Sequence, residues 1–166
     1  MSTRMKSILG TVGLVLILAA ANFAVWQHET TLASGQVMYL KLAPVDPRSI
    51  MQGDYMALRF ELDAKLGANA PRHGQAVVRL DARGVAEFVR VHQGEALAAN
   101  ERLLEFRGRG RRSRIVTDAY FFEEGQGGRY ANARFGELRV RPDGVALLLG
   151  LADGSLAPLG PSRYAR

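Results

Sequence analysis

The sequence predicts a mainly β domain, an antiparallel sandwich or small barrel with one short helix, preceded by a single N-terminal transmembrane helix. Two observations predict this fold class. An uncharged, largely apolar stretch occupies residues 8–26, and after it short segments of alternating apolar and polar residues follow one another with turn signals between them. Short strands at such close spacing favour an antiparallel sandwich or barrel over a parallel α/β sheet.

The N-terminal stretch has the length and polarity of a transmembrane helix. No residue from Ile8 to Trp26 is charged, and a helix needs about 20 residues to cross the hydrocarbon core of a bilayer. Arg4 and Lys6 precede the stretch, whereas the next Lys or Arg after it is Lys41. The positive-inside rule therefore predicts that residues 1–7 stay in the cytoplasm and that everything after the stretch is exported.

The expected organisation is an anchor at 8–26, a linker at 27–35 and an extracytoplasmic β domain at 36–166. The chain would then be a single-pass protein of the bacterial inner (cytoplasmic) membrane with its C-terminal domain in the periplasm. A cleaved signal peptide is the alternative, because Ala19-Ala20-Ala21 resembles a small-residue cleavage site. The apolar stretch continues beyond Ala21 to Trp26, which makes it longer than the apolar middle of most signal peptides. Both alternatives export the domain.

The composition is that of an ordinary globular protein with a basic excess. Of 166 residues 48% are hydrophobic and 23% are charged, and the net charge is +6. The chain has no cysteine, which excludes disulfides and thiolate metal sites. Export argues against nucleic acid as the partner of the basic residues. We expect neither a cofactor nor a metal, because His28, His73 and His92 lack the spacing of metal ligands.

Strand pairs are predicted along the whole exported domain. An extended segment at 37–42 comes first. The predicted hairpins join residues 76–81 to 85–91, 103–106 to 115–122 and 138–141 to 145–149. Gly84 and Gly144 can supply the positive φ that tight turns need. Between the last two hairpins, residues 129–135 predict one or two helical turns that end at Gly136.

The first informative block begins with Asp46-Pro47-Arg48-Ser49 and continues through Gly53-Asp54. Asp before Pro opens a turn, and its carboxylate can accept backbone N–H groups. The residues after it alternate between apolar and polar, which predicts a half-buried strand. Its buried side would carry Met56, Leu58, Phe60 and Leu62.

The second block contains Tyr120 to Gly125 and Tyr130 to Val140. Together the two blocks resemble the GDYXXLXY family of bacterial proteins, whose motif stands here as Gly53-Asp54-Tyr55-Met56-Ala57-Leu58-Arg59-Phe60. The upstream Asp-Pro-Arg-Ser, the Glu124-Gly125 pair and the run from Ala133 to Glu137 are also similar to that family's pattern. The resemblance implies a small, membrane-anchored, extracytoplasmic domain of unassigned activity that is an accessory subunit of a polytopic membrane protein.

One position departs from the family's motif. Its final tyrosine is Phe60 in this chain, and the alternation places Phe60 on the buried side. A hydroxyl is therefore dispensable there, and we expect this aromatic ring to pack in the core and to take no part in chemistry.

We hypothesise that the two blocks form one polar rim that receives a partner or a ligand. Its residues would be Asp46, Arg48, Ser49, Asp54, Tyr55, Glu124, Tyr130, Arg134 and Glu137. Charged side chains on a loop rim without a core role are where binding usually resides. The alternative is that each block satisfies its own backbone and that the two lie at opposite ends of the sheet.

A Ser/Lys hydrolase similar to membrane signal peptidases is the alternative function, with Ser49 as the nucleophile. That chemistry requires a lysine whose pKa is lowered by burial. Beyond the anchor the chain offers Lys41 and Lys65, and neither lies in an apolar strand downstream of the serine. Catalysis has no other support in the sequence.

The arginine cluster is the last feature with a functional interpretation. It comprises Arg107, Arg109, Arg111, Arg112 and Arg114. On the outer surface it could meet anionic headgroups or an acidic partner. A solvated hairpin tip is the alternative.

Overall fold

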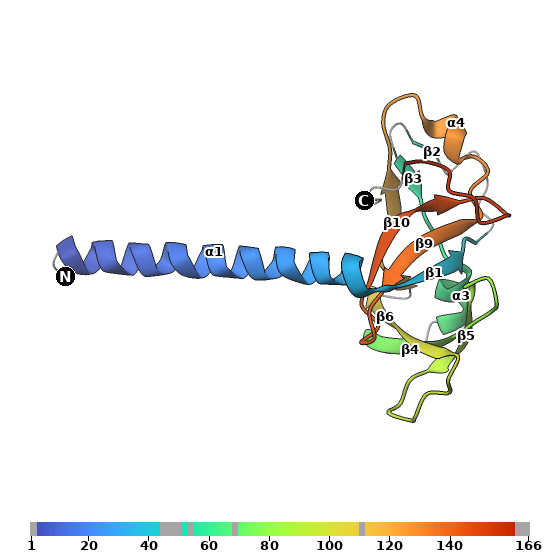
Figure 1. Ribbon diagram of the computed structural model, residues 1–166, viewed down its shortest axis with the longest axis horizontal. Coiled ribbons are helices and arrows are strands. Elements are labelled where there is room, and N and C mark those ends of the chain that lie inside the picture. Colours follow the sequence, from blue (N-terminus) through green and yellow to red (C-terminus); the bar gives the residue numbers. More distant parts are fainter. Residues whose placement is uncertain (1–2, 44–50, 53–54, 68–69, 110–111, 162–166) are drawn as a thin grey trace.

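The computed structural model describes residues 3–43, 51–52, 55–67, 70–109 and 112–161. One long helix, α1, runs into a β domain whose strands curve around a common core (Figure 1). Among the described residues the strand pairs are antiparallel, and the isolated bridge between Tyr39 and Val85 is parallel. The predicted mainly β, antiparallel fold class with a preceding apolar helix is confirmed.

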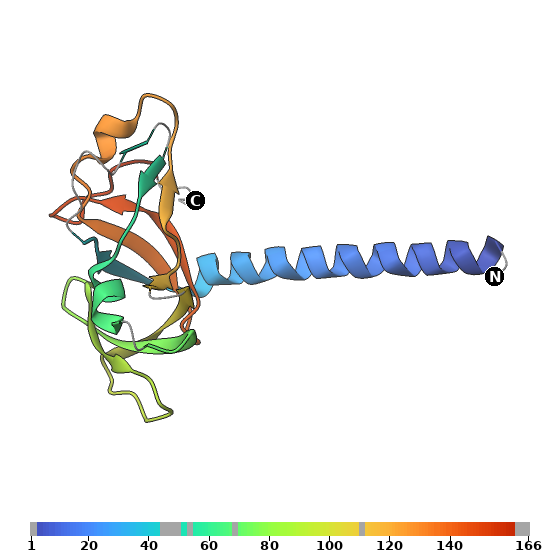
Figure 2. The same ribbon diagram turned by 180° about the vertical axis from the view of Figure 1, so that it is seen from behind.

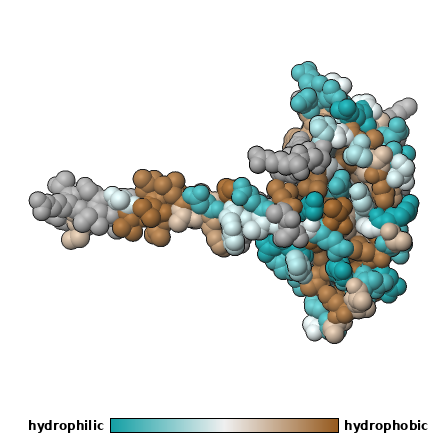
Figure 3. Space-filling view, viewed as in Figure 1, coloured by the Kyte–Doolittle hydropathy of each residue, from teal (hydrophilic) through white to brown (hydrophobic). Residues whose placement is uncertain are grey.

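Helix α1 (Thr3–Ser34) has 32 residues and is therefore about 48 Å long at 1.5 Å per residue. Its large apolar side chains point outward, from Val12 at 50% exposed to Ile17 at 68%. Figure 3 shows apolar surface along the middle of the helix on the face in view. Among the described residues this is the one helix long and apolar enough to cross a membrane, over Thr11–Leu32 with a mean hydropathy of 1.5.

The segment 27–35, expected as a linker, is helical up to Ser34. Neither proline nor glycine interrupts the chain between Trp26 and Gly35, so nothing ends the helix earlier. The Gly35 N–H donates to the Thr31 carbonyl oxygen at 2.9 Å, which closes the last turn. Strand β1 begins at the next residue, Gln36. The helix therefore enters the β domain without a flexible connection.

The described residues of the domain form three sheets. The first has the order β1 (Gln36–Lys41), β9 (Phe135–Val140), β10 (Ala146–Ala152). The second has the order β5 (Ala86–Val91), β4 (His73–Leu80), β6 (Glu101–Arg109), β7 (Arg112–Ile115). The third has the order β2 (Met51–Gln52), β3 (Tyr55–Ala57), β8 (Ala119–Phe121). Helices α3 (Glu61–Leu66) and α4 (Gly127–Tyr130) complete the domain.

Isolated bridges connect the sheets into a partly closed barrel. Tyr39 bridges Val85, which joins the first sheet to the second. Leu42 bridges Phe60, which joins the first sheet to the chain that leaves the third. The side chains inside this barrel form one main core that includes Met38, Leu104 and Leu138, each fully buried.

Two predicted hairpins are confirmed, with their turns. β4 pairs with β5 and β9 with β10. Gly84 has φ +80 and Gly144 has φ +89, the conformation for which glycine is suited. In the first turn the Asp81 carboxylate accepts the Arg83 and Val85 N–H groups, each at 2.8 Å.

The predicted strand at 55–62 is wrong in its second half. β3 ends at Ala57 and the chain enters α3 at Glu61. The buried positions are nevertheless as predicted: Met56, Leu58, Phe60 and Leu62 are all buried. The helix forms because Leu62 and Leu66, one turn apart, both face the core. The Asp63 carboxylate also accepts the Phe60 N–H at 3.0 Å, at the start of the helix.

Two other predicted elements are shifted. The expected strand at 115–122 divides after Ile115, where Val116 has φ +49, so β7 and β8 belong to different sheets. The helical turn expected at 129–135 is α4, which ends at Tyr130. Gly136 does not terminate it, because Gly136 is the second residue of β9.

Candidate functional site

The inner side of the GDYXXLXY-like segment joins the two sequence blocks in the core. Phe60 is 1% exposed, and its ring lies directly over Gly136 of the second block. A Cβ built on Gly136 would lie 2.8 Å from the Phe60 Cε1 atom and 3.2 Å from the Leu148 Cδ1 atom. Glycine is therefore required at this point of β9 for packing. The expectation that Phe60 is a packing residue is confirmed.

The outer side of the same segment presents an aromatic pair. Tyr55 on β3 lies opposite Phe121 on β8 in the antiparallel register, and their ring centroids are 5.7 Å apart. Phe121 is 60% exposed, whereas the preceding residue of β8, Tyr120, points into the core. Tyr55 and Phe121, which we call the outer aromatic pair, thus bring one residue of each block to the surface.

Tyr130 lies behind this sheet and not on a rim. It is 5% exposed, and its ring contacts Tyr120 and Phe122, each at a centroid distance of 5.2 Å. A Cβ built on Gly160 would lie 2.6 Å from the Tyr130 hydroxyl oxygen, so the C-terminal segment covers it. Tyr130 belongs to the core and holds α4 against β8.

Of the remaining described rim residues, Glu124 closely follows β8, whereas Arg134 and Glu137 lie at the first sheet. Glu124 is exposed in the turn before α4. Arg134 is exposed and donates to the adjacent Ala133 carbonyl oxygen at 3.0 Å. Glu137 lies on β9 opposite Tyr39, where burial and the Glu137 charge raise the pKa of the tyrosine. Arg134 and Glu137 are thus set on the first sheet's side, whereas Tyr55 is on the third sheet.

Asp46, Arg48, Ser49 and Asp54 lie outside the described residues. The polar rim that these four would share with the second block therefore stays a prediction. What the structure does show is that the two blocks meet, through Tyr55 and Phe121 on the outside and through Phe60 and Gly136 inside.

A family model of GDYXXLXY proteins matches residues 17–151, which is most of the chain. This chain belongs to the GDYXXLXY family. No curated protein and no solved structure matches it. Among the described residues at the fixed positions of the GDYXXLXY motif, Leu58 and Phe60 are core residues, whereas Tyr55 is only partly buried.

Neither lysine of the β domain has the surroundings of a Ser/Lys catalytic base. The Lys41 side chain is 57% exposed and its Nζ lies 2.8 Å from the Glu61 Oε1 atom. Lys65 is exposed on α3. A general base of this kind needs burial away from opposite charge, so these environments do not favour the hydrolase alternative. Among the described residues no group of three or more His, Asp or Glu side chains could hold a metal ion.

The described members of the arginine cluster lie on β6 and β7. Arg107 and Arg114 are opposite one another in the register of these two strands and both are exposed. Each has an acidic partner: Arg107 Nε lies 3.1 Å from a Glu105 oxygen and Arg114 Nη1 lies 2.9 Å from an Asp118 oxygen. In the described part of the cluster, the charge is thus partly compensated within the hairpin itself.

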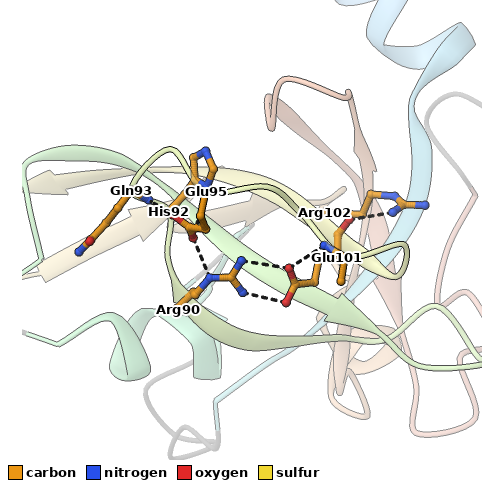
Figure 4. A network of polar contacts seen from close by, with 7 residues as sticks. Arg90, His92, Gln93, Glu95, Glu101 and Arg102 are labelled. Atoms are coloured by element: carbon orange, nitrogen blue, oxygen red, sulfur yellow. Dashed lines mark hydrogen bonds and ion pairs between the residues drawn. The ribbon is translucent and has the colours of Figure 1, made fainter.

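An ion-pair network that sequence reasoning missed holds the segment between β5 and β6 (Figure 4). Arg90 donates to both Glu101 oxygens, at 2.8 and 3.1 Å, and to Glu95 at 2.7 Å. Glu101 is buried and also accepts the Ala98 N–H at 3.1 Å. Glu95 accepts the Gln93 N–H at 2.7 Å. We call Arg90, Glu95 and Glu101 the arginine clamp.

The clamp perturbs both carboxylates in the same direction. Hydrogen bonds from Arg90 and from the Ala98 backbone hold the pKa of Glu101 below its ordinary value. The pKa of Glu95 is lowered to about 2, mainly by backbone N–H groups, including that of Gln93, and then by Arg90. Both carboxylates are therefore ionised at neutral pH.

A cavity of about 480 Å³ lies between this segment and the start of β1. Its walls come from three places: β1, the segment before and within β6, and the turn between β9 and β10. Residues lining it include Gln36, Met38, Leu97, Arg102, Leu103 and Val140. No sequence signal marks this cavity, because its lining residues are dispersed along the chain and include none of the motif.

Proposed function

We propose that this chain is a membrane-anchored accessory domain that binds a polytopic membrane protein on the outer side of the cytoplasmic membrane. In this proposal α1 crosses the membrane with its N-terminus inside, and the β domain is periplasmic. The family match and the single apolar helix support an anchored domain of this kind. The chemistry of the described residues supplies no catalytic constellation that would favour an enzyme instead.

The observation that carries the proposal is that the end of α1 is packed directly against the first sheet. Thr31, in the last turn of the helix, is buried. The Arg139 side chain of β9 donates to the Gly35 carbonyl oxygen at 2.8 Å. A Cβ on Gly35 would collide with the Thr31 carbonyl oxygen and would lie 3.2 Å from the Val140 N atom. The helix end and β9 are therefore packed together, so the domain has a defined height and orientation above its anchor.

The distance between the end of the membrane-spanning part of α1 and the β domain is short. If the hydrocarbon core ends near Trp26, residues 27–34 extend the helix by about 12 Å. The headgroup layer on each side of a bilayer is roughly 5–8 Å thick. The β domain would then begin just above the headgroups, at the level of the extracytoplasmic loops of a polytopic protein. A partner with a large soluble domain is not needed to reach it.

The outer aromatic pair is the surface that we propose for this contact. β8 lies on the side of the domain from which α1 leaves, as the opposite views in Figures 1 and 2 show. Exposed aromatic side chains are enriched at the centres of protein interfaces. Tyr55 also belongs to the family's motif, yet unlike Leu58 and Phe60 it is not fully buried in the core.

Co-purification from mildly solubilised bacterial membranes tests the proposal. The full chain should bring down one polytopic protein in a stoichiometric amount. A flexible Gly/Ser insertion between Ser34 and Gly35 should reduce its recovery, whereas the same insertion at the exposed turn of Gly154 should not. Phe121→Ala should weaken recovery, and Leu97→Ala, at another exposed apolar position of the domain, should leave it unchanged. No stoichiometric partner for the unaltered chain would refute the accessory function.

The orientation has its own test. A reporter that is active only after export, fused behind Arg166, should be active in cells. Reversing the charge before the anchor with Arg4→Glu and Lys6→Glu should lower that activity, because the positive-inside signal is lost. A reporter active only in the cytoplasm would contradict both the orientation and the periplasmic location.

A further inference from the structure

We propose that the cavity beside the end of α1 binds an anionic amphiphile, with the hydrocarbon chain inside and the negatively charged head at Arg102. This is a ligand site in addition to the partner contact, and it does not depend on the identity of that partner. Its volume of about 480 Å³ lies within the roughly 300–1,000 Å³ that small-molecule pockets have.

The interior of the cavity is suited to a hydrocarbon chain. Met38 and Val140 form buried parts of its lining, and Leu103, Pro142 and Leu97 add further apolar surface. Leu97 is 39% exposed. In the described part of the β domain, Leu97 and Phe121 are the two large apolar side chains with this much exposure. An apolar ligand in the cavity would remove Leu97 from water, which is favourable in proportion to the area covered.

Arg102 supplies the charge at the edge of the cavity. Its Nε donates to the Gln36 Oε1 atom at 2.8 Å, and its Nη1 donates to the Ala99 and Glu101 carbonyl oxygens at 2.9 and 2.7 Å. These acceptors are all uncharged. In the described part of the chain no carboxylate pairs with Arg102, and its Nη2 group donates to no protein acceptor. The guanidinium is thus held in place with one donor edge available for an anion.

The wall that carries Leu97 is held by the arginine clamp. Glu101 accepts the Ala98 N–H, and the Glu101 N–H donates back to the Ala98 carbonyl oxygen at 3.0 Å. Figure 4 shows Arg90 between Glu95 and Glu101, with Arg102 beyond Glu101. Because charged groups behind the wall fix its backbone, the cavity is a formed feature of the fold and does not need to open for a ligand.

The position of the cavity next to the end of α1 indicates which class of ligand it would bind. Gln36, which both lines the cavity and accepts from Arg102, is separated from the last residue of α1 only by Gly35. Under the proposed topology the cavity therefore lies close to the outer leaflet. A membrane lipid with an anionic headgroup has both the chain and the charge that the cavity matches. A free long-chain fatty acid has the same chemistry from another source.

A site-specific fluorescent probe can test the site in the full chain. The chain has no cysteine, so Ala99→Cys gives a single position for a bimane label beside the cavity. The labelled chain would be placed in nanodiscs of phosphatidylcholine and titrated with increasing proportions of phosphatidylglycerol. Oleate and inorganic phosphate would be titrated separately, as the free amphiphile and as the head alone. We expect a saturable change with phosphatidylglycerol.

Three variants decide whether that change comes from the cavity. Arg102→Gln should raise the midpoint about tenfold, the effect of losing one charge-assisted hydrogen bond. Ala98→Leu, which fills the cavity from an exposed position, should abolish the saturable change. Arg59→Gln, an exposed arginine outside the lining, should leave the midpoint unchanged.

Each outcome has a meaning. Saturation with oleate but not with phosphatidylglycerol would support the amphiphile site and identify the free acid as its source. A change that rises linearly, or that is equal in all variants, would overturn the proposal in favour of simple proximity to the membrane. The same change with inorganic phosphate alone would also overturn it. None of these readings depends on recovery of the polytopic partner.

Discussion

The two ends of the β domain are held together by different kinds of interaction. At one end, the third sheet and α4 are fastened by aromatic contacts among Tyr120, Phe122 and Tyr130. At the other end, the segment between β5 and β6 is fastened by the arginine clamp. Helix α1 joins the domain between these ends (Figure 1). Aromatic packing is insensitive to pH, whereas the clamp depends on ionised carboxylates.

This difference indicates how each end of the domain can present a binding surface. The aromatic end buries its fastening residues and leaves Phe121 outside, so the exposed residue can change without loss of the fold. The clamp end uses charged groups to position an apolar wall, so its cavity depends on electrostatics. We expect stability to respond to mutation most strongly at the first end and to pH most strongly at the second.

The largest expected effect separates the buried Phe60 of the motif from the exposed Phe121 of β8. Phe60→Ala should lower the free energy of unfolding by about 3–5 kcal/mol, because a fully buried aromatic is lost and a cavity remains over Gly136. Phe121→Ala, the same substitution at a 60% exposed position, should change it by less than about 1 kcal/mol. Denaturant unfolding of both variants measures the difference. Equal losses would show that Phe121 is a core residue in solution.

The next effect concerns the clamp. Arg90→Met removes the partner of both carboxylates while keeping much of the side-chain volume, and it leaves Glu101 buried without its counter-ion. We expect a lower Tm and faster hydrogen exchange at the Ala98 and Gln93 amides, whose acceptors are the clamp carboxylates. Exchange near Tyr120 and Tyr130 should not change. Arg83→Met is the control, because its ion pair with Asp81 is long, at 3.6 Å, and exposed. An unchanged exchange rate at Ala98 would contradict the clamp's role.

Much of this fold could be predicted from the sequence, and the successes have a common cause. Alternation marks buried positions whatever the secondary structure, which is why Met56, Leu58, Phe60 and Leu62 are all buried. Turn chemistry is local as well, so Gly84 and Gly144 were found with the hairpins that they close. The strand boundary at Ala57 was missed, because Leu62 satisfies a period of two with Phe60 and a helical period with Leu66.

The site was harder to predict because it depends on residues far apart in the chain. Tyr130 carries a hydroxyl and stands among charged residues, so the sequence suggested a rim, whereas packing on Tyr120 and Phe122 buries it. The role of Gly136 also arises only from tertiary contact, with Phe60, which is 76 positions earlier in the numbering. Arg90 and Glu101 are separated by a segment without any motif, and no local sequence pattern predicts their ion pair.

A smaller effect comes from Asp63, which opposes the pH response of the clamp. Burial raises the pKa of Asp63 to about 6, against the backbone N–H groups that lower it. A carboxyl with a raised pKa in the folded state binds a proton before the unfolded chain does, so stability should increase as pH falls from about 6 to 4. The size is on the order of 1–3 kcal/mol. Asp63→Asn, which keeps an acceptor for the Phe60 N–H, should remove this increase in unfolding measured across that range. If the slope persists in the variant, another group is responsible.

The smallest expected effect is that of Glu95, the more exposed carboxylate of the clamp. Its pKa is lowered to about 2 by backbone N–H groups and Arg90, so in the folded state it remains ionised after the unfolded chain has begun to bind protons. A depressed pKa contributes stability that is complete above the ordinary carboxyl value and is lost as pH falls from about 4.5 towards 2. Glu95→Gln should therefore lower Tm slightly at pH 7, by less at pH 3, and hardly at all near pH 2, each relative to the unaltered chain at the same pH. Because the glutamine can still accept the Gln93 N–H, the exchange rate of that amide should increase only modestly, and far less than in Arg90→Met. A Tm deficit that is the same at all three pH values would show that Glu95 acts through its shape and hydrogen bonding and not through its charge, and the clamp end would then be no more sensitive to pH than the aromatic end.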